Sequence, residues 1–325
     1  MKLIYFGVSD EEEPYIQRWS FLNKVPVTIR KEQISKETIA FAKGHDGICL
    51  YPSAEMSQNE SFYRTLRSYG MKQLSIKSTG IDGVNLEWAK KYHLQVTNVP
   101  SYSPTSVGHF AVMAILMLAR NLPLRINERD HLSRKIAIGD EIQSITVGII
   151  GTGRIGMVVA QTIAAMGGKV VAYSHSHNPQ LEPFVSYLSL EEVVQKSDII
   201  SIHIPLTKES YHLFDDALFA KMKPNAKIVN TARGKIINTD ALLRWLAQGN
   251  AGGCMLDTLE NEEAYFHLGQ EKNPLYQQLM AYPNVFITPH IAYYTQLAVK
   301  EIAETALNNA YDILEHGESR NTISV

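Results

Sequence analysis

The chain has 325 residues, of which 45% are hydrophobic, so it is long enough to bury a core in each of two domains. Its formal net charge of -2 comes from dispersed charges without a basic block, which argues against a nucleic-acid or anionic-membrane surface and favours small-molecule partners. Cys49 and Cys254 are too few for a disulfide framework or a zinc site. The start lacks the basic segment of a signal peptide, and no apolar run spans a bilayer, so we expect a cytoplasmic protein.

The first hundred residues alternate between strand and helix patterns. Acidic residues in segment 9–14 mark the start of a first helix, because the positive end of the helix dipole favours them. Further helical patterns cover 57–69 and 85–92. Short apolar runs predict strands at 2–8, 25–30, 47–51, 73–78 and 95–98. This alternation predicts one small α/β domain.

A long, mostly apolar helix is predicted over 105–120, after two prolines in segment 98–104. Such a helix must be covered on most of its surface, so we place it at a domain or subunit junction and expect a homodimer. The sequence offers no specific chemistry for His109 on this helix, and we expect it to be a packing residue.

Residues 147–156 read VGIIGTGRIG, an uncharged strand pattern that runs into three spaced glycines and then a helical pattern, with a second strand at 169–173. Gly151 would permit the tight turn, Gly153 would let the backbone approach a pyrophosphate, and Gly156 would let the helix pack close to the strand. An ordinary tight turn between strand and helix is the alternative. The order of the elements favours dinucleotide binding.

The remainder of the chain repeats this alternation. Helices are predicted at 189–195, 215–222, 239–248 and 295–316, and strands at 198–204, 226–230, 253–256 and 285–288. We therefore predict an α/β fold of two doubly wound parallel-sheet domains, in which a Rossmann nucleotide-binding domain is inserted in a smaller flavodoxin-like substrate domain. The substrate domain would comprise 1–100 and 296–325, and the dinucleotide-binding domain 101–295.

Three polar side chains follow successive strands of the second predicted sheet: Arg233, Glu262 and His290. An arginine can hold a substrate carboxylate through two parallel hydrogen bonds, a histidine can protonate a carbonyl oxygen, and a neighbouring carboxylate raises the histidine pKa. Singly, each residue could be a solvated loop residue. Together, after a nucleotide-binding motif, they predict hydride transfer to a 2-oxo acid.

The chain resembles the D-isomer-specific 2-hydroxyacid dehydrogenases over nearly its whole length. The motifs are NVPSYSP, VGIIGTGRIG, SDIISIHIPLT, MKPNAKIVNTARG and NVFITPHIAYYT. The resemblance places the family's catalytic arginine, glutamate and histidine on Arg233, Glu262 and His290, and it implies a D-2-hydroxy acid as the product. AYYT after His290 and YSP at Tyr102 are closer to the D-lactate and D-2-hydroxyisocaproate branch.

That branch also implies residues that hold the substrate. They are Tyr51, the backbone amides of Thr79 and Gly80, and Tyr102, together with Tyr293 in the AYYT segment. A tyrosine at position 51 would narrow the side-chain pocket, which favours a pyruvate-sized substrate.

The cofactor is expected to be NAD(H) or NADP(H). The nucleotide motif normally has an acidic residue about 20 positions beyond its glycines, where it binds the adenosine ribose. Here Ser174-His175-Ser176-His177 takes that place, which removes repulsion of a 2′-phosphate and predicts that NADPH is accepted. The residues expected to bind the cofactor are Gly151, Gly153, Arg154, Ile155, Gly156, Ser174, His175, Ile204, Pro205, Thr231, Ala232 and Asp257.

The predicted function is reduction of a short 2-oxo acid to its D-2-hydroxy acid by NAD(P)H. The same chemistry on larger branched or aromatic 2-oxo acids is one alternative. The other is an NAD(H)-sensing protein, because the superfamily resembles NAD-regulated corepressors. No metal site is predicted, since His175 and His177 lack a third ligand nearby, and His203 in a strand is expected to be a packing residue.

Overall fold

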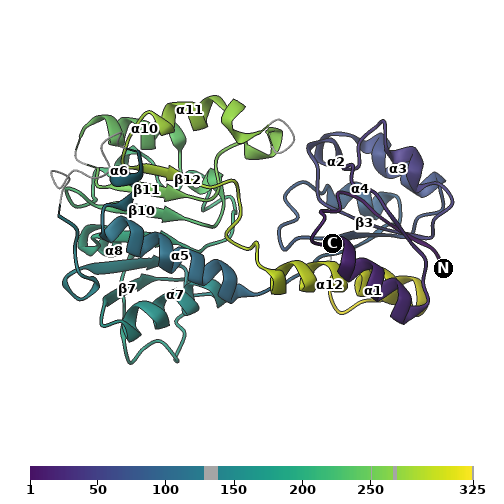
Figure 1. Ribbon diagram of the computed structural model, residues 1–325, viewed down its shortest axis with the longest axis horizontal. Coiled ribbons are helices and arrows are strands. Elements are labelled where there is room, and N and C mark those ends of the chain that lie inside the picture. Colours follow the sequence, from purple (N-terminus) through teal and green to yellow (C-terminus); the bar gives the residue numbers. More distant parts are fainter. Residues whose placement is uncertain (128–137, 250, 266–268, 324–325) are drawn as a thin grey trace. The chain divides into compact units, whose positions relative to one another are not determined.

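The computed structural model describes residues 1–127, 138–249, 251–265 and 269–323. The chain divides into two compact units. Unit 1 combines Met1–Ser103 with Tyr294–Val325, and unit 2 is Pro104–Tyr293. Each unit is a parallel sheet covered by helices on both faces, as predicted (Figure 1).

The sheet of unit 1 has the strand order β2-β1-β3-β4-β5, with every pair parallel. This is the flavodoxin-like order. The strands are β1 (Leu3–Tyr5), β2 (Val27–Ile29), β3 (Gly47–Leu50), β4 (Gln73–Ile76) and β5 (Gln95–Thr97). The helices are α1 (Glu13–Asn23), α2 (Ala54–Gln58), α3 (Glu60–Ser68), α4 (Leu86–Lys91) and α12 (Gln296–His316), with a short 3-10 helix η1 (Ile39–Ala42).

Alternate residues of each strand in unit 1 face opposite helix layers. Leu74 and Ile76 of β4 belong to the apolar core that includes residues of α3. Ser75 between them faces the other way and donates a hydrogen bond to the carbonyl oxygen of Ala306 in α12, at 2.7 Å. Helix α1 packs against α12 on this second face (Figure 1).

The single helix predicted over 57–69 is wrong, because two helices occupy the segment. The Asn59 side chain accepts a hydrogen bond from the backbone N–H of Ser61 and so caps α3, which separates it from α2.

The sheet of unit 2 has the order β12-β11-β10-β9-β6-β7-β8, again all parallel. Read outward from β6, this is the Rossmann order with one additional strand. The strands are β6 (Thr146–Ile150), β7 (Lys169–Tyr173), β8 (Val185–Tyr187), β9 (Ile199–Ile202), β10 (Lys227–Asn230), β11 (Gly253–Leu256) and β12 (Val285–Ile287).

Two apolar clusters cover the two faces of this sheet. Ile199 and Val229 pack with residues of α5 and α7, whereas Ile200, Ile202 and Ile228 pack with residues of α8, α9 and α10. Strands buried on both faces explain the continuous apolar runs of the sequence. The helices are α5 (Pro104–Ala119), α6 (Leu122–Asn127), α7 (Arg154–Ala165), α8 (Leu190–Lys196), α9 (Asp216–Phe219), α10 (Thr239–Ala247) and α11 (Pro274–Met280). The 3-10 helices are η2 (Ile142–Ser144), η3 (Gly234–Ile236), η4 (Glu262–Ala264) and η5 (Gln270–Lys272).

Helix α5 is covered along one side by α7 and by the sheet of its own unit. Its uncovered side includes His109 and Met113, which are exposed, so His109 does not pack within its own unit as predicted.

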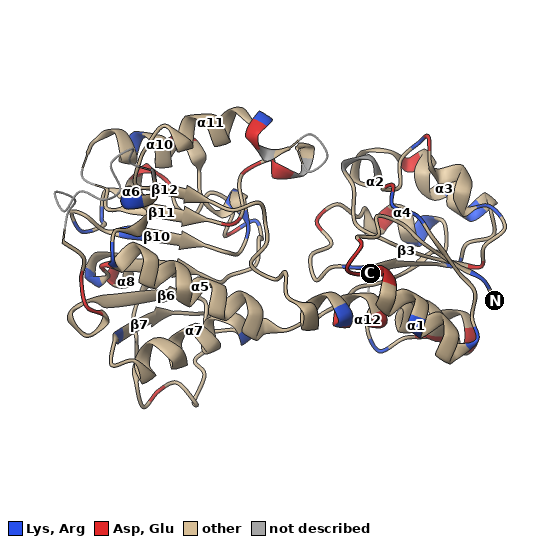
Figure 2. Cartoon of the chain, in the orientation of Figure 1, with Lys and Arg blue, Asp and Glu red and all other residues tan. Residues whose placement is uncertain are grey.

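Charged residues are scattered over both units in the view of Figure 2. Among the described residues, no helix is long and apolar enough to cross a membrane.

Candidate active site

The turn between β6 and α7 has the backbone that its glycines predict. Gly151 has φ +95°, and a Cβ there would lie 2.8 Å from the carbonyl oxygen of His203 and 2.7 Å from Cγ2 of Ile204. A Cβ on Gly156 would overlap the carbonyl oxygen of Gly151, so this glycine lets α7 lie close to the turn. Nothing lies within 4 Å of the Cβ position of Gly153, at the N-cap of α7. The backbone at Gly153 is therefore open to a ligand.

These features fit a dinucleotide. Open backbone at the N-terminus of a 12-residue helix can accept a phosphate, because unpaired N–H groups and the helix dipole favour negative charge there. Thr231, at the end of β10, is 8% exposed, and its Oγ1 has no hydrogen-bond partner among the described residues. A bound ligand would satisfy such a group. Of the other residues predicted to bind the cofactor, Arg154 and Pro205 are exposed, while Ile155, Ile204 and Ala232 are half-buried.

The segment after β7 carries no carboxylate near the glycine turn. Ser174 is half-buried, and its Oγ accepts a 3.4 Å hydrogen bond from the N–H of Thr152. His175 is exposed and lies edge-on to the Tyr173 ring, with 5.9 Å between ring centroids. The ring of His177 is stacked on the ring of Tyr187, a contact that sequence patterns alone do not predict.

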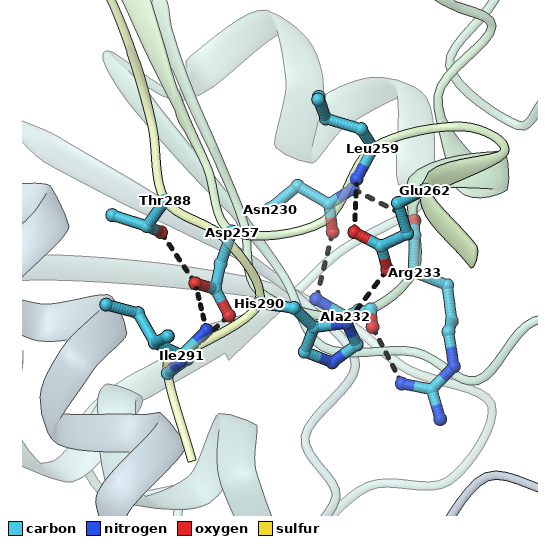
Figure 3. Close-up of polar contacts among 10 residues, drawn as sticks. Asn230, Ala232, Arg233, Asp257, Leu259, Glu262, Thr288, His290 and Ile291 are labelled. Carbon is cyan, nitrogen blue, oxygen red and sulfur yellow. Dashed lines mark hydrogen bonds and ion pairs between the residues drawn. The ribbon is translucent and has the colours of Figure 1, made fainter. Parts of the chain in front are cut away.

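Arg233 is placed by the loop that follows β10. The Asn230 side chain donates to the carbonyl oxygen of Arg233 at 2.9 Å and accepts from the N–H of Ala232 at 3.0 Å. Arg233 Nη1 donates to the carbonyl oxygen of Ala232 at 2.8 Å (Figure 3). A Cβ on Gly234 would overlap the backbone of Leu259, so this glycine brings the arginine loop against the loop that carries Glu262. Sequence reasoning missed both Asn230 and Gly234.

Glu262 and His290 form a direct pair, with 2.8 Å between Oε1 of the glutamate and Nδ1 of the histidine (Figure 3). The second oxygen, Oε2, accepts the N–H of Leu259 at 3.0 Å. The glutamate side chain is 8% exposed, whereas the histidine side chain is 31% exposed. The pair thus joins a buried carboxylate to a ring that reaches the surface of the unit.

Asp257 holds the loop that carries this histidine. Its Oδ1 accepts from the Thr288 hydroxyl at 2.6 Å and from the Ile291 N–H at 2.9 Å, and its Oδ2 accepts from the Ala292 N–H at 2.9 Å (Figure 3). The N–H of His290 donates to the carbonyl oxygen of Asp257 at 2.9 Å. His290 itself has φ +56°, a conformation that a non-glycine residue adopts only when its surroundings enforce it. The Asp257 carboxylate supplies such a constraint.

The pKa of His290 is raised above its ordinary value. Burial opposes the charged ring, but the hydrogen bond and charge of Glu262, together with the charge of Asp257, outweigh burial and the repulsion from Arg233. Because Nδ1 faces Glu262, Nε2 is the ring nitrogen on the opposite side, suited to donate a proton. Tyr293 lies edge-on to the ring at 6.4 Å between centroids.

The other residues predicted to bind substrate belong to unit 1. Tyr51 follows β3 and is half-buried, as is Tyr102. In the turn after β4, Ser78 Oγ donates to the Gly80 carbonyl oxygen at 2.6 Å, and Thr79 Oγ1 donates to the Val99 carbonyl oxygen at 2.8 Å. The backbone N–H groups of Thr79 and Gly80 take no part in these two bonds.

His203, expected to be a packing residue, pairs through Nε2 with Ser201 Oγ at 2.8 Å. Burial lowers its pKa to about 3, which favours the neutral ring.

Comparison with known proteins gives one consistent family. The family model described as D-isomer specific 2-hydroxyacid dehydrogenase, NAD binding domain, matches residues 112–292. The D-lactate/D-glycerate dehydrogenase of Pediococcus acidilactici is 34% identical over 99% of this chain and 99% of its own length. A crystal structure of a D-lactate dehydrogenase from Treponema pallidum covers 100% of both chains at 32% identity, with a TM-score of 0.88.

An NAD-complexed structure described as a D-isomer specific 2-hydroxyacid dehydrogenase, from Lactobacillus delbrueckii ssp. bulgaricus, covers 100% of both chains at 34% identity, with a TM-score of 0.84. These full-length matches confirm the predicted fold class, including the Rossmann-type domain.

Proposed function

The chain belongs to the D-isomer-specific 2-hydroxyacid dehydrogenase family and is an NAD-dependent enzyme of that family, and we propose that its substrate is pyruvate, reduced to D-lactate. The observation that carries this proposal is the 2.8 Å pair of His290 and Glu262 at the edge of the sheet where Arg233 also lies. The relatives named above include enzymes described as D-lactate dehydrogenases, so neither a corepressor-like sensor nor a preference for larger acids is favoured.

In the proposed mechanism, Arg233 binds the substrate carboxylate through its guanidinium and so orients the carbonyl group. The bound dinucleotide supplies the hydride that adds to the carbonyl carbon. His290 donates the proton from Nε2 to the carbonyl oxygen, which completes the hydroxy acid. Glu262, hydrogen-bonded to Nδ1 at 2.8 Å, keeps the ring protonated before the transfer and fixes its orientation.

Unit 1 supplies most of the remaining substrate contacts in this proposal. The backbone N–H groups of Thr79 and Gly80 would bind the carboxylate, since the turn's own hydrogen bonds use its other polar groups. Tyr51 would limit the size of the substrate side chain, and Tyr102 and Tyr293 would line its site. Asp257 would lie on the nicotinamide side of the cofactor site. Its carboxylate would also hold the loop that carries His290.

We also propose that NADPH is accepted alongside NADH. Ser174 stands where a carboxylate would repel a 2′-phosphate, and its half-buried hydroxyl and the exposed His175 offer hydrogen bonds instead. Ser174→Asp should raise the ratio of NADH to NADPH efficiency. An unchanged ratio, with both cofactors tested at saturating pyruvate, contradicts this proposal.

A homodimer is proposed through the uncovered side of α5 and the adjoining α6. Met113, Leu122 and Ile126 are 42%, 37% and 51% exposed there, and large apolar side chains gathered on a surface favour association. Sedimentation of the wild type against Ile126→Glu tests this, with a dimer expected only for the former.

Both cysteines are buried free thiols, which is compatible with a cytoplasmic protein.

The deciding experiment follows oxidation of NADH with pyruvate, 2-oxoisocaproate and phenylpyruvate in parallel, with the chirality of the product determined. The proposal expects the highest kcat/KM with pyruvate and a D-hydroxy acid as product. Absence of turnover with every 2-oxo acid, or an L-hydroxy acid product, contradicts it.

A further inference from the structure

Lys77 is a fully buried lysine at the carboxyl end of the sheet in unit 1. Its side chain is 0% exposed, and its Nζ donates to the carbonyl oxygen of Gly7 at 2.8 Å. It also lies 2.8 Å from each oxygen of Glu12, whose side chain is 6% exposed. A buried charge is costly unless it is paired and hydrogen-bonded, so the fold holds these atoms in one arrangement.

The same ammonium group contacts two aromatic rings. Nζ lies 4.3 Å from the ring centroid of Tyr51 and 4.8 Å from that of Tyr5. A cation attracts the face of an aromatic ring, and it does so more strongly when water is excluded. Tyr5 is fully buried in β1, whereas Tyr51 is half-buried and reaches the surface of the unit. Lys77 therefore contacts the ring of a side chain that is itself partly accessible.

The topology of unit 1 indicates why this ring matters. The chain leaves β1 toward α1 on one face of the sheet and leaves β3 toward α2 and α3 on the other, although the two strands are neighbours. Ligands of doubly wound sheets bind beyond the carboxyl ends of the strands at such a divergence. Gly7 follows β1, Tyr51 follows β3 and Lys77 follows β4. The buried pair thus lies at the edge of the sheet where a ligand of this unit is expected.

We propose that Lys77, held by Glu12, is a positioning residue that fixes the Tyr51 ring and thereby limits the size of the 2-oxo acid accepted. The inference rests on the proposed function, because it assumes that Tyr51 contacts the substrate side chain. A ring fixed by a buried ammonium group cannot swing aside to admit a larger substituent. Removal of the pair takes this contact away from the ring without changing the proton donor or the carboxylate-binding arginine.

A purely structural role is the competing explanation, since a buried ion pair at the start of α1 could serve only to hold unit 1 together. That role would lower the amount of folded enzyme and would reduce turnover of all substrates by one common factor. A positioning role instead changes the ratio of kcat/KM for pyruvate to kcat/KM for 2-oxoisocaproate. The ratio separates the two explanations, because the concentration of folded enzyme cancels in it.

The test measures this ratio in the wild type and in the double variant Lys77→Met/Glu12→Gln, which removes both charges and leaves neither unpaired. The ratio should fall on the order of tenfold, the discrimination that a few carbons in an apolar pocket provide. In a Tyr51→Ala background the same double change should have no further effect on the ratio. Leu74→Ala is the control, since Leu74 is fully buried in β4, directly before Lys77, but faces the opposite core.

An active double variant with an unchanged ratio overturns the inference, and so does an equal fall of the ratio in the Tyr51→Ala background. If the double variant does not fold, Lys77→Arg keeps the charge but moves the group that faces the ring, and an unchanged ratio there overturns the inference equally. A wild type that turns over no 2-oxo acid contradicts the proposed function instead.

Discussion

Each unit has a cation paired with a carboxylate at the carboxyl edge of its sheet, but the two pairs differ in exposure. In unit 2 the His290 side chain is 31% exposed and its partner Glu262 is 8% exposed. In unit 1 Lys77 is 0% exposed and Glu12 is 6% exposed. A pair with one accessible member can exchange a proton with a ligand, whereas a pair buried on both sides can only hold its neighbours in place. In our proposals, the same charge pattern thus serves proton transfer in unit 2 and positioning in unit 1.

The largest expected effect follows from removing the accessible member. His290→Gln keeps a side chain that can hydrogen-bond to Glu262 but cannot deliver a proton. We expect kcat/KM for pyruvate to fall by about a thousandfold, within the usual contribution of a general acid. Binding of NADH, followed by its fluorescence, should be retained. Turnover at the wild-type rate would remove the assigned role of His290.

Removing one member of the buried pair in unit 1 should instead lower the free energy of unfolding. Lys77→Met leaves Glu12 buried without its cation, which costs about 3 to 5 kcal/mol in the free energy of unfolding. Urea denaturation of the wild type and the variant measures the difference. The double variant Lys77→Met/Glu12→Gln should recover much of this loss. Equal stability of the wild type and Lys77→Met would show that the pair is not buried as described.

A smaller effect is expected at Asp257, whose carboxylate bonds to the loop that carries the proton donor and not to its ring. Asp257→Asn replaces one accepting oxygen by an amide group, so a bond to the 291–292 backbone is lost. We expect about a tenfold fall in kcat/KM, as loss of one charge-assisted hydrogen bond would give. Thr288→Val, which removes only the hydroxyl bond to the same carboxylate, is the milder control. A larger effect from the threonine change would contradict this account.

The placement of the proposed catalytic residues could be predicted from the sequence because it depends on one rule of parallel sheets. Arg233, Glu262 and His290 follow β10, β11 and β12, and the carboxyl ends of parallel strands share one edge. The supporting residues could not be predicted in this way. Asn230 bonds to the backbone of its own loop, and Asp257 bonds to a loop more than thirty residues away. Such contacts depend on loop conformations that no periodic pattern encodes.

The fold was predictable wherever apolar runs were long. β8 was missed because an edge strand of three residues with only Val185 buried gives no recognisable pattern. α11 was also missed, although Asn273 followed by Pro274 is a usual helix start that could have indicated it. Lys77 could not be predicted as a buried residue, because a lysine at the end of a strand is normally exposed. Only the tertiary structure shows that it is buried and faces the Tyr51 ring.

The most direct test of the central claim is the pH dependence of kcat/KM for pyruvate reduction in the wild type and in Glu262→Gln. Reduction requires protonated His290, so activity is present below the pKa of His290 and is lost as pH rises through it. Because Glu262 raises that pKa, the alkaline fall of the variant should occur at lower pH than that of the wild type. Coincident alkaline limbs in the two enzymes would contradict the account.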